Sequence, residues 1–552
     1  MLSFSPEHTP PSRPLQENLR FHALRDPERT AIIYYGKTVT YGELWRDAER
    51  LAATLAGRLG VRPGDRVALD MQNCPQFIAA YYAILVAGGV VVPLNPMYRP
   101  AEVARMMKDA GARVAILASE LLDRFTGWEG AEELALVVAR YADALPDAPV
   151  GPPPAVALEP APVEADARVL PWDAALAAGA GLPAPAPPAD FDPAAALCVM
   201  PYTSGSTGTP KGCPHTHAAA MHTAALQVEW YRMTQASVIT AVQPLFHVAG
   251  MQGSMNAGIL AGGALLVMTR WDAAAAARLF ADYGPTFFNG PPTMIIDLLS
   301  HADFTDAAFR RLEVITGGGS AMPVAVAERL RQRFGLTYVE GYGMSETMSP
   351  THLNPLAAPV PGSIGVPVQE TLALIVDPET LAPLPDGETG EILVAGPQVI
   401  ARYWGDRSAG SFVEIDGVRM LRTGDLGYRD ARGYYYVVDR LKRMINASGF
   451  KVWPAEVEEV LFAHPDVEQC CVVAAPDPYR GETVAAAVIL HPHARGRTTA
   501  ADLVAWCRER LAAFKVPRRV TFVETLPRTA SHKIDWRQVQ EQLAAGGAAA
   551  AE

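Results

Sequence analysis

Two apolar stretches of the chain show the same order of predicted elements. Residues 83–107 (AILVAGGVVVPLNPMYRPAEVARMM) and 257–280 (AGILAGGALLVMTRWDAAAAARLF) each run from an apolar helix through Ala-Gly-Gly into an apolar strand and a second helix. The strands lack polar alternation, so they are expected to be buried on both faces, as in parallel sheets flanked by helices. The recurrence predicts an α/β fold with two pseudo-repeated subdomains packed together in a large N-terminal domain.

Neither stretch is predicted to cross a membrane. The uncharged segment 77–94 reaches the lower length limit of a membrane helix, but Gly88-Gly89 splits it and Pro93 ends its β-branched part. The uncharged segment 248–269 contains Gln, Ser and Asn residues and several glycines. The first residues, MLSFSPEHTPPSRP, lack the basic start and apolar core of a signal peptide, so none is expected. The pattern of cysteines described below predicts a cytoplasmic setting.

Other regions of the chain depart from this pattern. Residues 143–190 are rich in Pro and Ala and predict an extended surface excursion. Residues 386–438 contain short alternating segments and turns, which predict a small β-rich subdomain. Beyond them the pattern predicts an α+β domain with a helix, two strands, a helix and a strand at 454–461, 468–475, 483–491, 500–513 and 519–523. We therefore predict a large domain over 1–438 and a small one over 439–552.

Composition limits the classes of partner. With 552 residues the chain is too long for one core, so at least two domains are expected. A net charge of −12 gives no general attraction to nucleic acid or to an anionic membrane, so a phosphate-bearing substrate would need local positive charge. The six cysteines, at 74, 198, 213, 470, 471 and 507, have no CxxC spacing, which predicts reduced thiols rather than disulfides or a zinc site.

The segment YTSGSTGTPKG at 202–212 is the strongest functional signal. Its small residues allow backbone N–H groups to turn toward a ligand, and its hydroxyls and Lys211 add donors and a positive charge, which suits a polyphosphate. It follows an apolar strand at 197–200, and ligands of open α/β sheets bind at strand ends. It matches neither a Walker A loop nor a dinucleotide fingerprint. Taken alone, it could also be a Ser/Thr/Gly surface linker.

Five more blocks give this segment a context. They are PLFHVAG (244–250), EGYGMSE (340–346), RTGD (422–425), DRLKRMINASGFKVWPAEVE (439–458) and PRTASHKID (527–535). Together, and in this order, the blocks resemble those of the adenylate-forming superfamily, which contains acyl-CoA synthetases, luciferases and the adenylation domains of peptide synthetases. The resemblance covers nearly the whole chain and is closest to fatty-acid-type acyl-CoA ligases. It implies a large AMP-binding domain followed by a small mobile lid domain.

The resemblance also implies an activity, that of an AMP-forming acid–thiol ligase. A carboxylate would attack the α-phosphorus of ATP to give acyl-AMP and pyrophosphate, and CoA would then give acyl-CoA and AMP. Because two anions meet in the first step, Mg²⁺, lysines and backbone donors are expected in the site. The expected partners are ATP, Mg²⁺, CoA and a small carboxylic acid, without nucleic acid, and a homodimer is left open.

The resemblance assigns the nucleotide site block by block. The β- and γ-phosphates are expected on Thr203, Ser204, Gly205, Ser206, Thr207, Gly208 and Lys211. Adenine and the α-phosphate are expected against Gly318, Gly319, Ser320, Gly341, Tyr342, Gly343, Met344 and Ser345. Glu346 and Thr207 are the expected Mg²⁺ ligands, Asp425 is the expected contact of the ribose hydroxyls, and Arg440 is expected to be a second ribose or phosphate contact. Without the family, Tyr342 could be a core aromatic and Gly424-Asp425 an ordinary turn.

Three residues are expected to take part in catalysis: Lys533, His247 and Glu346. Lys533 would reach the α-phosphate and the carboxylate from the small domain, although His532 stands where the family normally has Gly. His247 would border the acyl carboxylate, although alone it could be a core histidine. For thiolysis, Lys442 matches the family hinge and Ser448-Gly449 match the CoA contacts. Asn446 occupies a position that is often Lys in related plant enzymes, so a substrate contact there is left open.

The preferred acid is a medium- to long-chain fatty acid. The small residues Gly250, Gly253, Ala257 and Gly258 would leave room for an alkyl chain beside an apolar helix, although they can equally serve close helix packing. An aromatic or other small organic acid is the main alternative. A peptide-synthetase adenylation domain is disfavoured because PLFHVAG lacks the Asp that holds an α-amino group. A non-catalytic acyl-nucleotide sensor is disfavoured by the intact charged residues of the blocks.

Overall fold

A computed structural model describes residues 8–158, 168–186, 190–203, 210–318, 322, 324–447, 450–477, 481–528 and 534–548. The chain divides into two compact units, one of residues 1–372 and 394–421 and the other of residues 373–393 and 422–552. The predicted domains 1–438 and 439–552, with a hinge near Lys442, stay predictions.

The larger sheet of the first unit has nine strands in the order β18-β17-β16-β15-β14-β12-β13-β1-β2. Neighbouring strands from β16 to β1 are parallel, and the pairs at the two edges are antiparallel. The strands are β1 (Thr30–Tyr34), β2 (Lys37–Thr40), β12 (Val238–Ala241), β13 (Ala264–Val267), β14 (Phe287–Asn289), β15 (Val314–Gly317), β16 (Tyr338–Met344), β17 (Ser349–Leu353) and β18 (Val366–Pro367).

The second sheet of this unit has seven strands in the order β11-β8-β4-β3-β5-β6-β7 and is parallel except at β11. Its strands are β3 (Arg66–Asp70), β4 (Val90–Pro93), β5 (Val114–Ala118), β6 (Ala135–Ala139), β7 (Val169–Pro171), β8 (Leu197–Val199) and β11 (His215–Thr216). Strands β4 and β5 are buried along their whole length, as their lack of polar alternation predicts.

The two sheets contain the predicted pseudo-repeat. In the seven-stranded sheet, β4 and β5 lie on opposite sides of β3, and in the nine-stranded sheet β13 and β14 lie on opposite sides of β12 in the same order. The intervening helices are α3 (Pro75–Val86) and α4 (Pro100–Ala110) in one and α9 (Ala257–Ala261) and α10 (Ala273–Tyr283) in the other. Gly88 and Gly262 both end their helices in the left-handed conformation, with φ of 77° and 75°. The α/β fold with two similar subdomains is thus confirmed.

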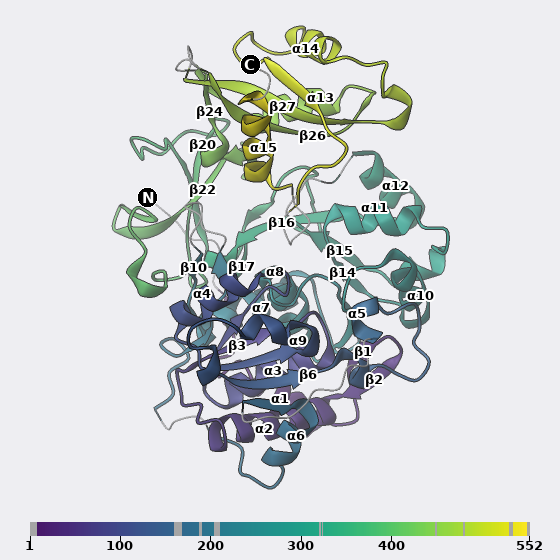
Figure 1. The fold of residues 1–552 in the computed structure, drawn as a ribbon, viewed down its shortest axis with the longest axis vertical. Helices are drawn as coiled ribbons and strands as arrows, with labels where there is room; N and C mark the ends of the chain where they lie inside the picture. Colours follow the sequence, from purple (N-terminus) through teal and green to yellow (C-terminus); the bar gives the residue numbers. More distant parts are fainter. Residues whose placement is uncertain are drawn as a thin grey trace. The chain divides into compact units, whose positions relative to one another are not determined.

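The remaining helices of this unit cover the sheets (Figure 1). Helix α2 starts with a capping box, in which the Glu43 N–H donates to Thr40 Oγ1 at 3.1 Å and the Thr40 N–H donates to Glu43 Oε2 at 2.9 Å. The other helices are α1 (Glu17–Arg25), α2 (Tyr41–Gly57), α5 (Ala155–Leu158), α6 (Trp172–Gly179), α7 (His217–Trp230), α8 (Val248–Gly250), α11 (Pro292–Ser300) and α12 (Val324–Phe334). None of the helices in the described part of the chain has the length and hydropathy of a bilayer-spanning segment.

Short helical turns connect these elements. The 3₁₀ turns are η1 (Ser119–Phe125), η2 (Ala131–Glu133), η3 (Tyr141–Ala144), η5 (Asp306–Phe309), η6 (Ser345–Thr347) and η7 (Trp404–Asp406). A π-helix, η4 (Met251–Asn256), lies between α8 and α9. Such wide turns are rare and occur frequently at functional sites.

The prediction of an extended excursion over 143–190 is wrong for part of that region. Strand β7 pairs with β6 at the edge of the seven-stranded sheet, and helix α6 packs against α2. Gly179 makes this packing close, because a Cβ there would lie 1.8 Å from the Arg50 carbonyl oxygen. The Ala-rich composition thus serves helix packing here, while residues 159–167 and 187–189 lie outside the described part of the chain.

A five-stranded sheet has the order β19-β20-β22-β21, with β23 paired to β22. Its strands are β19 (Leu372–Val376), β20 (Gly390–Ala395), β21 (Phe412–Ile415), β22 (Val418–Arg429) and β23 (Tyr435–Arg440). The strand-rich character predicted for residues 386–438 is present in these elements.

The second unit also contains an α+β region with the predicted order of elements. Its sheet is β25-β24-β27-β26, with β28 beside β27. The elements are η8 (Leu441–Arg443), β24 (Ile445–Ala447), β25 (Phe450–Val452), α13 (Pro454–Phe462), β26 (Val467–Asp477), β27 (Gly481–Leu490), η9 (Pro492–Ala494), α14 (Ala500–Arg508), β28 (Arg519–Phe522) and α15 (Trp536–Ala548). The sequence did not predict β24, β25 and α15, of which the first two are short.

All six cysteines are free and buried. The adjacent Cys470 and Cys471 belong to different apolar clusters, one with Val472 and the other with Val473. Successive side chains of a strand point to opposite faces, so β26 contributes to two cores at once. The prediction of reduced thiols agrees with this arrangement.

Asp70, at the end of β3, is a fully buried acidic residue whose two carboxyl oxygens have no hydrogen-bond partner among the described residues. Burial raises the pKa of the Asp70 carboxyl from 3.8 to about 7, Arg124 opposes this effect and Glu120 adds to it. The folded protein therefore favours the protonated acid.

We predict that Asp70→Asn changes how stability depends on pH. Between the ordinary pKa of 3.8 and about 7 the folded chain holds a proton that the unfolded chain releases, so the free energy of unfolding of the wild type falls as pH rises through this window. A shift of roughly three pKa units corresponds to about 4 kcal/mol. Denaturant unfolding at pH 5 and pH 8 should show the variant gaining stability relative to wild type at the higher pH.

The exposed Asp282 on α10 offers the control, since Asp282→Asn should leave the pH dependence of unfolding as in the wild type. Equal pH slopes for wild type and Asp70→Asn would mean that the Asp70 carboxyl does not titrate in this range.

Candidate active site

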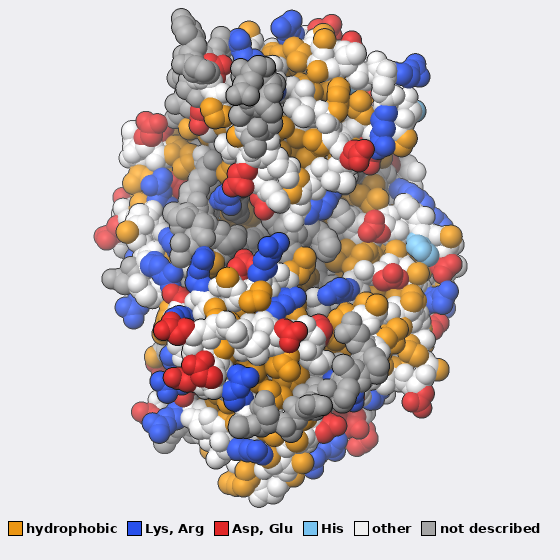
Figure 2. Space-filling view, in the orientation of Figure 1, with side chains coloured by type: hydrophobic (Ala, Val, Ile, Leu, Met, Phe, Trp, Pro, Cys, Tyr) orange, Lys and Arg blue, Asp and Glu red, His pale blue; other side chains and the backbone are white. Residues whose placement is uncertain are grey.

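Positive charge for a polyphosphate has to be gathered locally in this protein. On the face drawn in Figure 2, Lys and Arg side chains are interspersed with Asp and Glu. Lys211 lies in a two-stranded hairpin of β9 (Tyr202–Thr203) and β10 (Lys211–Gly212), in which Lys211 pairs with Thr203. The hairpin follows β8, as predicted. The predicted phosphate contacts Ser204, Gly205, Ser206, Thr207 and Gly208 lie outside the described residues.

Tyr403 brings Lys211 and Glu346 to one place. The Lys211 Nζ lies 4.7 Å from the centroid of the Tyr403 ring, a cation–π distance. The Tyr403 hydroxyl donates to Glu346 Oε1 at 2.7 Å. Burial, followed by the charge of Glu346, raises the pKa of Tyr403, so its hydroxyl stays protonated and remains a donor. A neutral ring thus separates a cation from a carboxylate while contacting both.

The turn that carries Glu346 is fixed from two further sides. The Ile400 N–H donates to the Glu346 carbonyl at 2.9 Å, and His215 Nε2 donates to the Ser345 carbonyl at 2.6 Å. Burial lowers the pKa of His215 to about 4, so the ring is neutral and its one proton sits on the nitrogen facing this carbonyl. The Glu346 side chain is only 7% exposed. Its position is therefore set before any ligand arrives.

Cys213 lies among the same groups. It clusters with Ile400 and Tyr403, and burial, together with Glu346, raises the pKa of its thiol well above the ordinary value. Such a thiol is a small apolar filler rather than a nucleophile.

Strand β16 carries the predicted adenine-site residues. Tyr342 pairs with His352 across β16 and β17, and their rings meet edge to face at 5.8 Å. At Gly343 a Cβ would lie 1.8 Å from the Ser349 carbonyl oxygen, and at Gly318 it would lie 2.4 Å from the Gly341 carbonyl oxygen. The glycines are thus required by the close approach of β15, β16 and β17. Met344 and Ser345 follow on the same strand and turn, whereas Gly319 and Ser320 lie outside the described residues.

His247 lies in the turn before α8, with an exposed side chain. Its Nδ1 accepts a hydrogen bond from the Ala249 N–H at 3.3 Å, so it caps this short helix. The alternative of a buried core histidine is excluded by its exposure.

The small residues beside the π-helix are tightly packed. A Cβ would lie 2.4 Å from the Pro244 carbonyl oxygen at Gly250, 2.6 Å from Asn289 Nδ2 at Gly253 and 2.5 Å from Leu265 Cδ2 at Gly258. Ala257 is fully buried. These residues serve close packing, which was the second of the two interpretations of the sequence, and they do not leave room for an alkyl chain.

Asn289 links the π-helix to the ends of β12 and β14. Its amide nitrogen lies 3.3 Å from the Ala249 carbonyl and 3.4 Å from Ser254 Oγ, and its Oδ1 accepts from Gln243 Nε2 at 2.8 Å. Because ligands of such sheets bind at the carboxyl ends of strands, these polar side chains belong to the candidate site. Sequence reasoning did not assign them to the site, because they lie outside the motifs of the phosphate and nucleoside blocks.

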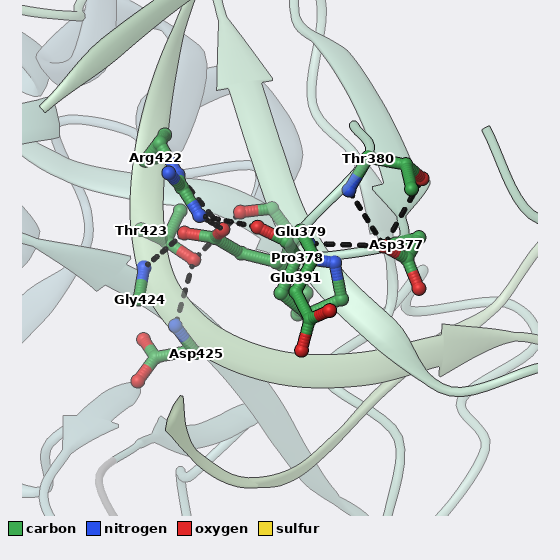
Figure 3. A network of polar contacts seen from close by, with 10 residues as sticks. Asp377, Pro378, Glu379, Thr380, Glu391, Arg422, Thr423, Gly424 and Asp425 are labelled. Atoms are coloured by element: carbon green, nitrogen blue, oxygen red, sulfur yellow. Dashed lines mark hydrogen bonds and ion pairs between the residues drawn. The ribbon is translucent and has the colours of Figure 1, made fainter. Parts of the chain in front are cut away.

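In the second unit, the RTGD segment lies within strand β22 rather than in a turn, and a buried carboxylate holds it (Figure 3). Glu391, which is 1% exposed, accepts from Arg422 Nε at 2.9 Å and from the Gly424 N–H at 3.1 Å. Thr423 Oγ1 donates to the Ile392 carbonyl at 2.7 Å and accepts from the Asp425 N–H at 3.1 Å. These hydrogen bonds therefore fix the backbone of β22 from which the Asp425 side chain extends.

Asp425 and Arg440 are direct neighbours across β22 and β23. The structure thus pairs Asp425, expected at the ribose, with Arg440, expected at the ribose or a phosphate, although the Arg440 and Lys442 side chains lie outside its description. Ser448, Gly449 and Lys533 also lie outside the described residues.

Comparisons with known proteins agree with this arrangement. The family model described as AMP-binding enzyme matches residues 19–404, and that of the AMP-binding enzyme C-terminal domain matches residues 456–533. A long-chain-fatty-acid–CoA ligase of Bacillus subtilis is 34% identical over 96% of this chain and 95% of its own. A feruloyl-CoA synthase of an Amycolatopsis species is 35% identical over 93% of this chain and 95% of its own.

Among solved structures, the ATP-bound MatB of Rhodopseudomonas palustris superposes with a TM-score of 0.82 at 28% identity, covering 97% of this chain and 99% of its own. The resemblance inferred from the sequence blocks is confirmed by these matches. The chain belongs to the AMP-binding enzyme family, which is the adenylate-forming superfamily that its motifs resemble.

Proposed function

We propose that this protein is an ATP-dependent acyl-CoA ligase. A carboxylic acid and ATP form acyl-AMP and pyrophosphate, and CoA then attacks the acyl carbon to give acyl-CoA and AMP. The single observation that carries the proposal is the contact of one tyrosine, Tyr403, with both Lys211 and Glu346. These are the cation and the carboxylate that a magnesium polyphosphate requires.

In this proposal Lys211 binds the β- and γ-phosphates together with Thr203 and residues 204–208. Glu346 and Thr207 hold Mg²⁺. Among the described residues no group of three or more His, Cys, Asp or Glu side chains could hold a metal ion. One buried carboxylate fits Mg²⁺, which is usually bound by one or two carboxylates together with substrate phosphates. When bound, the ion would neutralise charge on the phosphates.

The nucleoside is proposed to bind along β16 and the RTGD segment of β22. Tyr342 would stack on adenine, with the backbone at Gly318–Ser320 and Gly341–Met344 lining its pocket, and the Ser345 hydroxyl would contact the α-phosphate. Asp425 would accept two hydrogen bonds from the ribose diol, and Arg440 beside it would add a donor. The support is the hydrogen bond from the Asp425 N–H to Thr423 Oγ1 within β22 and the cross-strand pairing of Asp425 with Arg440.

Lys533 is proposed as the lysine that stabilises charge developing between the carboxylate and the α-phosphate. His247, exposed at the start of α8, would border the acyl carboxylate. For the second reaction, rotation about Lys442 would bring Ser448 and Gly449 to CoA, so that one site runs two steps in turn. The protein is proposed to act in the cytoplasm, and a homodimer is proposed without a defined interface.

The acid is proposed to be a medium- to long-chain fatty acid, with an aromatic acid as the alternative. Two relatives of similar identity support one class each, because one is a long-chain-fatty-acid–CoA ligase and the other a feruloyl-CoA synthase. Protein atoms occupy the space beside the glycines next to the π-helix, so these glycines favour neither a fatty acid nor an aromatic acid as the substrate.

We predict that the purified protein forms CoA thioesters from acids in a panel running from acetate to palmitate with benzoate and ferulate added. Acid-dependent ATP–pyrophosphate exchange should accompany the preferred acid. Lys533→Ala should lower this exchange at least about 100-fold, the scale expected for a lost charge contact in the transition state. Lys515→Ala, which removes a lysine paired with Glu456 in the same unit, is the matched control. Acyl-adenylate binding without exchange for any acid would point to a sensor instead.

We predict that Tyr403→Phe impairs the use of ATP while keeping the ring beside Lys211. The variant loses the hydrogen bond to Glu346, and a hydrogen bond to a charged group contributes about 1.5–3 kcal/mol. This corresponds to a decrease of about 10- to 100-fold in kcat/KM for ATP, with a higher Mg²⁺ concentration needed for half-maximal rate. Steady-state assays over a Mg²⁺ titration measure both effects.

Tyr283→Phe is the control for Tyr403→Phe, because it removes a hydroxyl with a long 3.4 Å contact to the Gly36 carbonyl. Tyr403→Leu, which removes the ring as well, should lower kcat/KM further. An unchanged Mg²⁺ requirement in Tyr403→Phe would contradict the role given to Glu346.

A further inference from the structure

The hairpin that carries Lys211 is tied to two segments far away in the sequence. Tyr202 opens the hairpin and Pro210 immediately precedes its returning strand. Both residues contact a single ion pair formed by Asp109 of α4 and Arg407, which follows η7. All four residues belong to the first unit.

Asp109 holds the outgoing strand. The Tyr202 hydroxyl donates to Asp109 Oδ2 at 2.6 Å, and the other carboxylate oxygen, Oδ1, pairs with the Arg407 guanidinium. Burial, followed by the hydrogen bond to Asp109, raises the pKa of Tyr202, so the hydroxyl stays a donor. The carboxylate is therefore occupied on both oxygens by groups from different parts of the chain.

Arg407 holds the returning strand. Its Nη1 donates to the Pro210 carbonyl at 3.1 Å and its Nε donates to the Trp404 carbonyl at 3.2 Å, while Nη2 faces Asp109. A guanidinium has donors in a fixed planar fork, so one side chain can serve three acceptors in a set geometry. The ion pair thus joins the two strands of the hairpin through one charged link.

Trp404 closes the same arrangement by packing. Its Nε1 donates to the Asp109 carbonyl at 2.9 Å, and its Cβ lies 3.0 Å from where a Cβ at Gly212 would be. The neighbouring Tyr403 faces Lys211 and Glu346. One short segment, 403–407, therefore contacts the hairpin at Pro210, Lys211 and Gly212 and is linked to Tyr202 through Asp109.

The energetics favour a role in positioning over a role in stability. The Arg407 and Asp109 side chains are 28% and 25% exposed, and ion pairs that water reaches contribute little to folding. An ion pair of this kind can instead favour ligand binding, because it restricts a ligand-binding group to one position.

We propose that Asp109 and Arg407 are positioning residues for ATP, because they hold the β9–β10 hairpin in the register that places Lys211 beside Tyr403 and Glu346. The inference rests on the proposed function only in taking ATP as the ligand. Because the hairpin is proposed to meet the β- and γ-phosphates, the pair matters for ATP binding and for the first reaction. Thiolysis of a preformed acyl-adenylate, which carries neither phosphate, does not depend on it.

Asp109→Asn and Arg407→Gln test this inference. We expect each to raise the Kd for ATP, measured directly by calorimetry, and the KM for ATP by about 10-fold, which is the effect of losing one well-placed contact. The kcat for thiolysis of purified acyl-adenylate by CoA should stay within about twofold of wild type. The melting temperature of the unliganded protein should change by less than about 4 °C, because a partly exposed ion pair contributes at most about 1 kcal/mol. The double variant should bind ATP no more weakly than whichever single variant has the higher Kd, because both substitutions break the same Asp109–Arg407 ion pair.

Two further variants separate positioning from a general loss of structure. Arg407→Lys should recover part of the ATP affinity, because an ammonium can pair with Asp109 but lacks the fork needed for Pro210 as well. Arg278→Gln, which breaks the more exposed Arg278–Asp303 ion pair, should change neither ATP binding nor thiolysis.

The inference is overturned if folded Asp109→Asn and Arg407→Gln bind ATP as the wild type does, or if thiolysis falls as much as ATP binding. A wild type that binds ATP but forms no thioester would refute the proposed ligase and still leave the binding comparison valid. A wild type that binds no ATP would overturn both.

Discussion

The contact of Tyr403 with Lys211 on its ring and Glu346 on its hydroxyl is the constraint on which the candidate site depends. A direct ion pair would neutralise both groups and leave neither for a ligand. An aromatic side chain between them keeps a cation and a carboxylate close together yet separate. In a chain with a net charge of −12, this arrangement supplies local positive charge without a basic surface. The two sheets, through β8 and β16, deliver the elements that meet there.

The sequence predicted the architecture correctly where burial of a strand determines its pattern of apolar and polar residues. The runs at β4 and β13 have no polar alternation, and the Ala-Gly-Gly turns end helices where Gly88 and Gly262 adopt positive φ. Prediction failed where composition was ambiguous. Alanine in α6 packs a helix against α2 as readily as it extends a linker, and nothing local marks the π-helix, whose Ser254 and Asn256 are hydrogen-bonded to Asn289 and Tyr82.

For the site, the sequence identified residues proposed to contact ligand and missed most of those that hold them. Lys211, Glu346 and Asp425 stand in short blocks whose composition fits their chemistry. Their supports lie elsewhere: His215 and Tyr403 fix the Glu346 turn, and Glu391 fixes the part of β22 before Asp425. A supporting residue needs only the right distance in space, so it leaves no motif. The segment YWGDR at 403–407 is aromatic and charged, but a connection between two strands often has such a composition, so it did not identify Tyr403 as a supporting residue.

The burial of every cysteine gives the molecule a set of internal reporters. Three thiols belong to the first unit and Cys470, Cys471 and Cys507 to the second, and burial raises the pKa of each. A thiol in this state reacts with an alkylating reagent only after the surrounding core opens. Because Cys470 and Cys471 face different clusters, modification at these two adjacent positions would distinguish loosening on one side of β26 from loosening on the other.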